Sequence, residues 1–252
     1  ILKSCKEFLE LTSFSILFAL QINKLLLLKK TMIEYNLFKT TTHRSITERT
    51  DKVKKAEISK LDFSDFNDYG FDYFDNEKFG VGYGGYSYDG RYENSIIEFI
   101  KHFSLPEKSK ILEVGCAKGY ILYEFYKKGF DVYGVDASSY AIKNSPIQIR
   151  ERLQLNLSST LSFDDNTFDL VFSKEVLPHL DEKNAIKLAR ECIRVTKGSN
   201  IFFEIQYADD NEGANLMKKW DNTHKTIRPK EWWIKQLEQI NYPGSYHFKK
   251  LF

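Results

Sequence analysis

The stretch from Ile111 to Gly119 constrains the fold of this chain more than any other. It reads Ile-Leu-Glu-Val-Gly-Cys-Ala-Lys-Gly, a short apolar run that breaks into glycines just before a helical pattern begins at Tyr120. Such a run is typical of a buried parallel strand. Glycines at 115 and 119 allow a sharp turn and the close approach of a ligand, toward which the next helix directs its positive end. The sequence therefore predicts a strand, a tight turn and a helix that together hold a ligand.

A second strand indicates that this ligand contains a nucleoside. Val132 to Val135 forms another short, largely apolar run, and Asp136 follows it directly. A carboxylate in this place is suited to accept hydrogen bonds from two ribose hydroxyls. We therefore expect Asp136 to bind the sugar of the ligand.

The spacing of the turn separates two classes of nucleoside cofactor. The dinucleotide fingerprint has small residues at its first, third and sixth positions, which here are Gly115, Ala117 and Tyr120. Tyr120 argues against a dinucleotide. The pattern acid-x-Gly-x-Gly-x-Gly of S-adenosylmethionine enzymes reads here as Glu113, Gly115, Ala117 and Gly119, with one Gly-to-Ala departure. Glu113 would face the positive end of that cofactor.

Composition indicates a cytoplasmic protein without a nucleic-acid partner. Lys and Arg number 37 against 35 Asp and Glu, which leaves a net charge of +2 and no strong field toward nucleic acid or membrane. The cysteines Cys5, Cys116 and Cys192 are widely spaced and suit a reducing compartment rather than a metal or redox pair. The 252 residues allow one α/β domain and an appendage.

The first 31 residues contain the most apolar stretch of the sequence, Leu11 to Leu28. Gln21, Asn23 and Lys24 interrupt it, whereas a membrane span requires about 20 cleanly apolar residues. We therefore expect no stable membrane insertion, and we interpret residues 1–31 as a non-functional or loosely ordered extension before Met32.

Residues 32–92 are expected to form an N-terminal arm followed by a lid. Aromatic residues, aspartates and glycines alternate from Phe63 to Tyr92, a composition too rich in glycine for a long helix. In one interpretation the tyrosines close over the cofactor or the acceptor, and Arg91 binds the methionine carboxylate. In the other, the segment is an ordered loop whose rings pack on the core.

Residues 93–252 are expected to form the cofactor-binding domain. Strands and helices alternate, which predicts a Rossmann-like, doubly wound, mostly parallel sheet of six or seven strands, with helices on both faces and an N-terminal cap. The expected strands are residues 111–114, 132–136, 150–156, 168–173, 200–205 and 246–252. The expected helices are residues 93–103, 120–128, 140–144, 183–195, 211–219 and 229–240.

From Tyr73 onward the sequence resembles the class I S-adenosylmethionine-dependent methyltransferases. The resemblance is carried by Ile111 to Tyr120, by Val132 to Asp136, and by Phe163 to Leu180, which looks like the fourth-strand motif of that family. The resemblance implies S-adenosyl-L-methionine as the cofactor and a small molecule as the acceptor. It also implies a sheet with one strand fewer than most relatives have.

Two further segments resemble a bacterial subgroup of this family. Gly84 to Arg91 and Pro229 to Trp232 are similar to segments of enzymes associated with the modification of sugars or surface polysaccharides. By analogy, this resemblance implies a sugar or sugar nucleotide as the acceptor.

The resemblance also assigns cofactor residues by position. Relatives often have Gly-Asp-Ala where this chain has Asn156-Leu157-Ser158, and Leu157 cannot accept the hydrogen bond of the adenine amine. Backbone atoms near Leu157 and Ser158 would then hold the adenine, beside Ala137. With Arg91 from the lid, the candidate cofactor residues are Glu113, Gly115, Cys116, Ala117, Gly119, Asp136, Ala137, Leu157, Ser158, Ser173 and Arg91.

Methyl transfer to a hydroxyl group requires a base. His179 is the first candidate and Glu175 the second, because both follow the fourth strand, and Glu204 ends the fifth. His179 could equally make only local packing contacts. Ser173 stands where metal-dependent O-methyltransferases have an Asp, so no metal is expected, and Ser173 to Val176 lacks the motif of nucleobase methylation.

The sequence thus predicts methyl transfer from S-adenosylmethionine to a small hydroxylated acceptor. Two alternatives remain open. The Ala117 and Leu157 departures fit a protein that binds the cofactor without catalysis, and an NAD-dependent oxidoreductase is the alternative that Tyr120 opposes.

Overall fold

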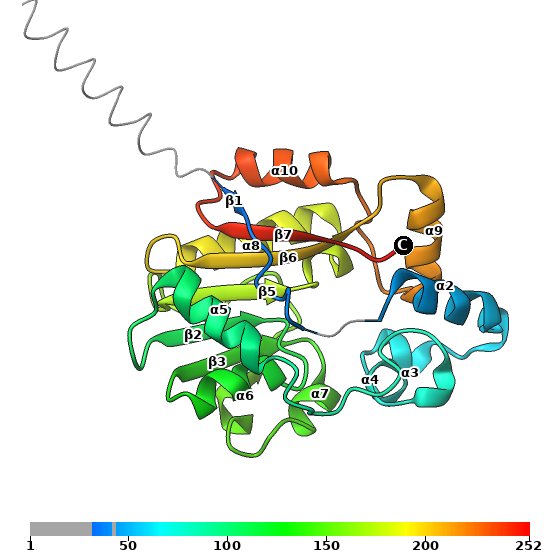
Figure 1. Cartoon of the computed structure of the whole chain (residues 1–252), viewed down its shortest axis with the longest axis horizontal. Helices are drawn as coiled ribbons and strands as arrows, with labels where there is room; N and C mark the ends of the chain where they lie inside the picture. The colour runs from blue at the N-terminus through cyan, green and yellow to red at the C-terminus, as the bar shows by residue number, and fades with distance from the viewer. Residues whose placement is uncertain (1–31, 42–43) are drawn as a thin grey trace, which may run out of the picture.

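A computed structural model describes residues 32–41 and 44–252 of the chain (Figure 1). The expectations for residues 1–31 lie outside this range. Within the described residues, every helix is too short or too polar to cross a membrane.

A seven-stranded sheet forms the centre of the molecule, in the order β1-β7-β6-β5-β2-β3-β4 (Figure 1). All neighbouring strands run parallel, so the predicted doubly wound, parallel architecture is confirmed. The strands are β1 (Ile33–Glu34), β2 (Lys110–Val114), β3 (Asp131–Asp136), β4 (Leu153–Leu155), β5 (Leu170–Lys174), β6 (Ile201–Tyr207) and β7 (Ser245–Lys250).

Successive side chains of the central strands enter two separate cores. Ile111 of β2 and Phe202 of β6 belong to the core on one face of the sheet, whereas Leu112 and Phe203, one residue later, belong to the core on the other. Because both faces are covered, these strands read as near-continuous apolar runs in the sequence.

The helices of the α/β domain cover the two faces of the sheet. On one side lie α5 (Glu93–Phe103), α6 (Tyr120–Lys127) and α7 (Ser139–Lys143), with Phe99 of α5 packed edge-on against Phe125 of α6. On the other lie α8 (Glu182–Val195) and α10 (Lys230–Gln239), whose Trp233 is fully buried. The apolar stripes of these helices supply the contacts that hold the sheet.

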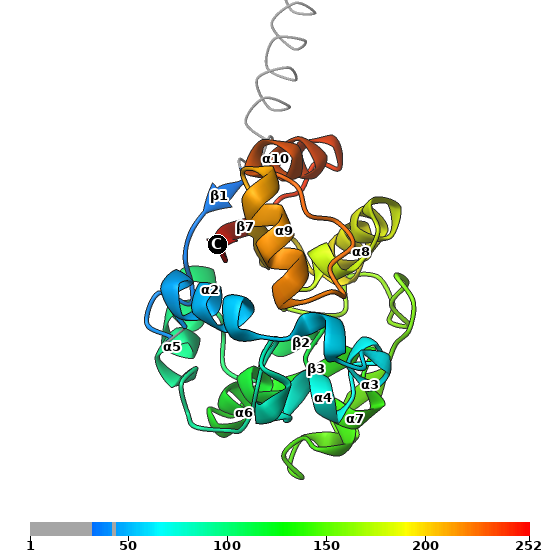
Figure 2. The ribbon, with the colours of Figure 1, turned by 90° about the vertical axis from the view of Figure 1, so that its right-hand side faces the viewer.

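The N-terminal segment contributes both to the sheet and to the roof of the site. β1 pairs with β7 at the sheet edge and brings the strand count to seven. The chain then forms α2 (Ile46–Lys55), a 3₁₀ turn (Ile58–Lys60), α3 (Ser64–Asn67), α4 (Phe71–Phe74) and a second 3₁₀ turn (Glu77–Phe79). With α9 (Asn211–Trp220), these helices lie over the carboxyl ends of the strands (Figure 2).

Some element boundaries differ from those expected. Arg150–Arg152 form a 3₁₀ turn in which Arg152 forms an ion pair with Asp131, so β4 begins only at Leu153. Phe168 lies in an isolated bridge with Thr196, and β5 begins at Leu170.

Candidate functional site

The turn after β2 requires glycine at two of its positions. Gly115 has φ +76°, and a Cβ placed on it would lie 2.0 Å from Cγ2 of Val176, which follows β5. Gly119 has φ +70°, and its Cβ would lie 2.9 Å from Cδ1 of Ile149. Ala117 also has a positive φ, +49°, a conformation unfavourable for any residue with a Cβ. The backbone turn is therefore formed as the sequence predicts, with strain at Ala117.

We expect Gly115→Ala to destabilise the protein strongly, because its Cβ would meet Val176 in addition to the strain of a positive φ. Gly129→Ala is the matched control, since Gly129 has φ +85° and no atom within 4 Å of an added Cβ. Urea unfolding should show a loss of about 1 kcal/mol for Gly129→Ala and about 2–4 kcal/mol for Gly115→Ala. Equal losses would mean that Val176 moves aside freely.

Asp136 joins the two loops that border the predicted cofactor site. Its Oδ2 accepts a hydrogen bond from the Ala117 N–H at 2.6 Å, and its Oδ1 accepts one from the Ser138 N–H at 2.8 Å. Burial raises the pKa of Asp136 above its ordinary value, although the backbone donors oppose this effect. Each carboxylate oxygen keeps a further lone pair, so binding of ribose hydroxyls by Asp136 stays a prediction.

Glu113 is a buried acid beside the turn. Its side chain is 2% exposed, and its Oε2 has no hydrogen-bond partner among the described residues. Burial, followed by the charge of Asp136, raises the pKa of Glu113 well above its ordinary value. A buried carboxyl oxygen without a partner fits a cationic ligand group, as predicted for the positive end of the cofactor.

The segment predicted as a lid lies against both cofactor loops. Lys118 of the turn forms an ion pair with Asp75 at 2.6 Å and donates to the Tyr86 carbonyl at 2.8 Å. Tyr140 of α7 donates to Asp75 at 2.7 Å. Arg91, predicted to bind the methionine carboxylate, forms an ion pair with Asp89 at 2.6 Å and lines the cleft under the lid. Its contact with a cofactor stays a prediction.

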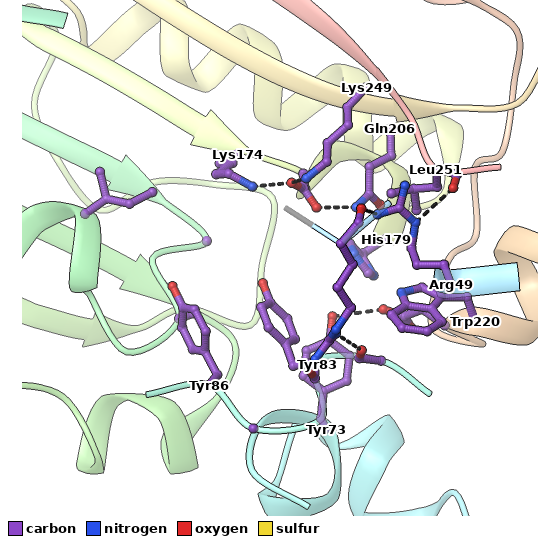
Figure 3. Close-up of a pocket in the computed structure, with 18 of the residues that line it drawn as sticks. Arg49, Tyr73, Tyr83, Tyr86, Lys174, His179, Gln206, Trp220, Lys249 and Leu251 are labelled. Carbon is purple, nitrogen blue, oxygen red and sulfur yellow. Dashed lines mark hydrogen bonds and ion pairs between the residues drawn. The ribbon is translucent and has the colours of Figure 1, made fainter. Parts of the chain in front are cut away.

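A cleft of about 690 Å³ lies beneath this lid, at the carboxyl ends of β2, β5, β6 and β7 (Figure 3). Seven of the predicted site residues line it: Arg91, Glu113, Gly115, Cys116, Ala117, Glu175 and His179. Gly119, Asp136, Ala137, Leu157, Ser158 and Ser173 do not. Leu157 is 79% exposed, whereas Ser173 is buried and its Oγ lacks a partner within the described part of the chain.

His179 lies in the 3₁₀ turn Leu177–His179 that follows β5. Its Nδ1 lies 2.7 Å from Oγ1 of Thr223, which donates its hydroxyl proton to Asp221 Oδ1 at 2.6 Å. Because the hydroxyl has one proton, Nδ1 of His179 must be the donor to Thr223, and Nε2 then has the free lone pair. Burial, followed by the neighbouring His224, lowers the pKa of His179 to about 4, so the ring is neutral at pH 7.

Known proteins share the sequence of the central part of the chain. Residues 112–203 match the family model described as "Methyltransferase domain". Residues 112–203 therefore contain a methyltransferase domain, in agreement with the resemblance to the class I enzymes. The cofactor of this class is S-adenosyl-L-methionine, and the glycine turn with the unpartnered Glu113 oxygen fits its charged methionine end.

Curated relatives share part of the methyltransferase domain. The 2-methyl-6-phytyl-1,4-hydroquinone methyltransferase of Synechocystis sp. is 33% identical over 125 residues, which cover 47% of this chain and 38% of that protein. The phosphoethanolamine N-methyltransferase of Plasmodium falciparum is 26% identical over 133 residues, covering 51% of this chain and 48% of its own. The chain thus spans less than half the length of either relative.

A solved structure is also similar to the methyltransferase domain. The S-adenosylmethionine-dependent methyltransferase of Archaeoglobus fulgidus has a TM-score of 0.49 and 22% identity, and the match covers 59% of this chain and 66% of that one.

Glu175, the second candidate base, is held by three neighbours. Its Oε1 accepts hydrogen bonds from Lys174 and, at 2.6 Å, from Lys249, and its Oε2 accepts one from Gln206. Burial alone would raise the pKa of Glu175, but the two ammonium groups hold it well below its ordinary value. A carboxylate held in its ionised form by two ammonium groups is a weak proton acceptor.

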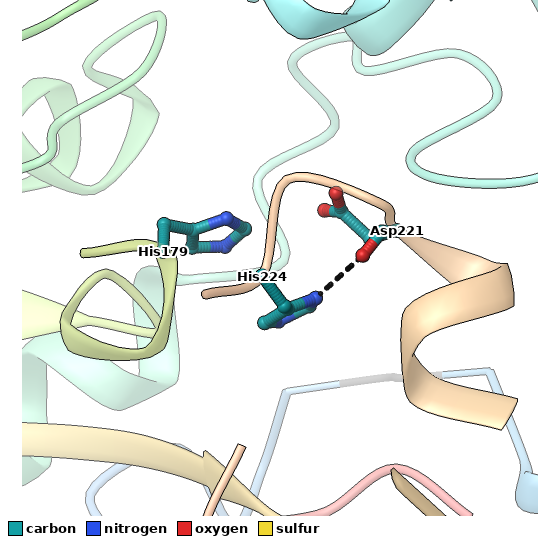
Figure 4. A group of neighbouring side chains, drawn as sticks. All are labelled: His179, Asp221 and His224. Carbon is teal, nitrogen blue, oxygen red and sulfur yellow. Dashed lines mark hydrogen bonds between the residues drawn. The ribbon is translucent and has the colours of Figure 1, made fainter. Parts of the chain in front are cut away.

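Three side chains beside the cleft could reach a common metal ion. The potential ligand atoms of His179, Asp221 and His224 lie within 4.8 Å of one another (Figure 4). The two imidazole rings are stacked, with centroids 4.3 Å apart, and His224 is engaged by the Asp221 carbonyl and by Gln206. Rings that converge on one ion do not normally stack face to face, so the expectation of no metal stands as a prediction.

Several polar residues of the cleft were not among those predicted from the sequence. They are Arg44 and Arg49 from the arm, Gln206 at the end of β6, and Asp221 and His224 after α9, while Thr223 contacts Asp221 beside the cleft. Arg44 and Arg49 resembled ordinary surface charges, and the Asp-x-Thr-His run after α9 matched no known motif. The residue types of Asp221 and Thr223 are typical of a turn. This composition does not indicate that the turn contacts His179.

Proposed function

We propose that the protein transfers the methyl group of S-adenosyl-L-methionine to a hydroxyl oxygen of a small acceptor, with a sugar or sugar nucleotide as the leading class. The observation that supports this most is the arrangement of His179. Its neutral ring lines the cleft that begins at the glycine turn, and the bond to Thr223 leaves Nε2 ready to accept a proton.

In this function the cofactor supplies a methyl carbon activated by its sulfonium. When bound, S-adenosyl-L-methionine would supply its methyl group to the acceptor oxygen and would leave as S-adenosylhomocysteine. Nε2 of His179 would accept the proton that the acceptor hydroxyl loses. Thr223 and Asp221 keep Nδ1 of His179 protonated, and the developing positive charge of the ring faces the Asp221 carboxylate through Thr223. The lid encloses the reacting groups through the Lys118–Asp75 ion pair.

The proposal is tested by incubating the protein with S-adenosylmethionine and a panel of hydroxylated acceptors. The panel should contain free sugars, sugar phosphates, sugar nucleotides and phenols. Mass spectrometry should detect an acceptor that is heavier by one methylene unit, together with S-adenosylhomocysteine. Formation of N-methylated products alone, from an added panel of amines, would contradict transfer to oxygen.

A second candidate function is cofactor binding without catalysis. Two observations favour it: Ala117 adopts φ +49° where the family pattern has glycine, and Leu157 is 79% exposed and offers no side-chain acceptor for adenine. This function predicts binding of S-adenosylhomocysteine with no product from any acceptor.

The pH dependence of the reaction follows from the environment of His179. The imidazole accepts a proton only when it is neutral, and with a pKa of about 4 it is already neutral at mildly acidic pH. We therefore expect kcat/KM for the acceptor, measured with saturating cofactor, to be unaffected by titration of His179 between about pH 6 and pH 8. If kcat/KM falls below a pKa near 6.5, the ordinary imidazole value, and this fall is lost in a His179 variant, the lowered pKa of His179 is contradicted.

A further inference from the structure

Two arginine side chains of the cleft form their hydrogen bonds only with backbone carbonyls. Arg49, in α2, is 6% exposed and donates from Nε to the Leu251 carbonyl at 2.9 Å and from a terminal nitrogen to the Arg44 carbonyl. Arg44 donates to the carbonyls of Gly82 at 3.2 Å and Tyr83 at 2.6 Å. Across residues 32–41 and 44–252, neither guanidinium has a carboxylate within ion-pair distance.

The lysines and Arg91 of the same cleft have such partners. Lys174 lies 3.1 Å from Glu204 and also contacts Glu175, and Lys249 contacts Glu175 at 2.6 Å. Arg91 contacts Asp89 at 2.6 Å. Among the described residues of the cleft, the positive charges without a carboxylate partner are therefore those of Arg44 and Arg49.

Two further acids that line the cleft, besides Glu175, are engaged elsewhere. Glu48, in α2, accepts a hydrogen bond from the Ser45 N–H at 2.6 Å and completes the capping box of that helix. Asp221 accepts hydrogen bonds from Tyr73 at 3.0 Å and from Thr223 at 2.6 Å. Neither acid offsets the buried charge by direct contact.

A buried guanidinium without a counter-ion is unfavourable, because its loss of hydration is repaid only in part by neutral carbonyls. Burial lowers the pKa of Arg49, and burial together with the charge of Arg91 lowers the pKa of Arg44. The rings of Phe252 and Trp220, at 5.9 Å from Arg49 and 5.7 Å from Arg44, supply weaker cation–π compensation. An anion entering the cleft would relieve both charges at once.

We propose that Arg44 and Arg49 bind an anionic group, a phosphate or a carboxylate, of the methyl acceptor. This proposal rests on the proposed function and narrows its acceptor to hydroxylated molecules that carry such a group. Arginine suits this task because its planar group donates two parallel hydrogen bonds to either anion.

The position of the pair favours the acceptor over the cofactor as the source of the anion. In the view of Figure 3, Tyr83 lies between Tyr86 on one side and Arg49 and Trp220 on the other. Tyr86 marks the cofactor end of the cleft, because its carbonyl accepts the hydrogen bond of Lys118 from the glycine turn at 2.8 Å. Arg49 thus lies toward the opposite end, where Leu251, which accepts its hydrogen bond, and Gln206 also line the cleft.

The test is a calorimetric titration of the full chain with inorganic phosphate at low ionic strength, in the presence of saturating S-adenosylhomocysteine. A parallel titration with acetate distinguishes a phosphate site from a carboxylate site. We expect at least one anion to bind saturably, and Arg44→Gln and Arg49→Gln each to weaken it about tenfold or more. Arg228→Gln is the matched control, because Arg228 forms an exposed ion pair with Glu182 outside the cleft, and it should leave the affinity unchanged.

Three results would overturn the proposal. They are the absence of saturable binding of both anions, equal binding by the wild type and the Arg44 and Arg49 variants, and loss of anion binding when S-adenosylhomocysteine is added. The last would assign the arginines to the carboxylate of the cofactor. If the Arg49→Gln protein does not fold, the affinity of Arg44→Gln for the anion decides the test, because Arg44 is only half-buried. Arginine-dependent anion binding by a protein that ignores S-adenosylhomocysteine would support the subsite while rejecting the proposed function.

Discussion

Replacement of His179 by alanine should lower kcat by about 100-fold or more while leaving the affinity for S-adenosylhomocysteine nearly unchanged. The variant loses the neutral imidazole that takes the acceptor proton, but it keeps the glycine turn and Asp136. Single-turnover methyl transfer to the active acceptor measures the effect. His102→Ala is the control, because His102 stacks on Tyr35 and contacts Ser245 outside the cleft.

Substitution of Thr223 tests whether His179 acts as a base that the Thr223 hydroxyl orients, or only packs beside the cleft. Thr223→Val keeps the shape of the side chain but removes the hydroxyl that accepts from Nδ1 of His179. We expect kcat to fall by about tenfold and Thr223→Ser to restore most of it, since serine keeps the hydroxyl. Full turnover in His179→Ala, or equal activity in the valine and serine variants, would remove His179 from the mechanism.

Asp136→Ala should weaken binding of S-adenosylhomocysteine by about 100-fold. The change removes the predicted acceptor of the ribose hydroxyls and also the two hydrogen bonds that join the Ala117 and Ser138 loops. Both losses act on the free energy of cofactor binding. Calorimetric titration gives the affinity directly, and urea unfolding shows how much of the loss reflects a weakened fold.

Asp131→Ala is the matched control for Asp136, because both acids lie on β3 at its opposite ends. Asp131 forms an ion pair with Arg152 at the start of β3, whereas Asp136 at its end accepts the hydrogen bonds of the Ala117 and Ser138 loops. We expect its replacement to leave the affinity for S-adenosylhomocysteine within about twofold of the wild type, as for other partly exposed ion pairs. Equal effects of the two substitutions would show that Asp136 supports the fold without contacting the ribose.

The parts of the fold that the sequence predicts are those with local signals. The run Ile111 to Val114 has the apolar character of a buried strand, and the glycines after it have the positive φ that their positions require. Gly115 is also required because Val176, distant in the sequence, leaves no space for a Cβ there. A glycine at this position of the sequence already indicates such a close approach. The cofactor half of the site could therefore be read from short segments.

The acceptor half of the site depends on contacts between distant residues and has no such signal. Arg49 donates to the Leu251 carbonyl across a sequence separation of 202 residues, and Tyr73 contacts Asp221 across 148. The arm residues are indistinguishable from surface charges until the fold brings α2 over the strand ends. The edge strand β1 also has no signal in the sequence, because it is only two residues long and forms through pairing with β7, distant in the chain.

The measurement that tests the central claim most directly is calorimetric titration of the purified chain with S-adenosylhomocysteine and, separately, with NAD. The turn after Val114, the unpartnered Glu113 oxygen and the Tyr120 departure from the dinucleotide fingerprint predict saturable binding of S-adenosylhomocysteine and no binding of NAD. Binding of NAD, or no heat of binding with millimolar S-adenosylhomocysteine, would contradict the assignment of this site.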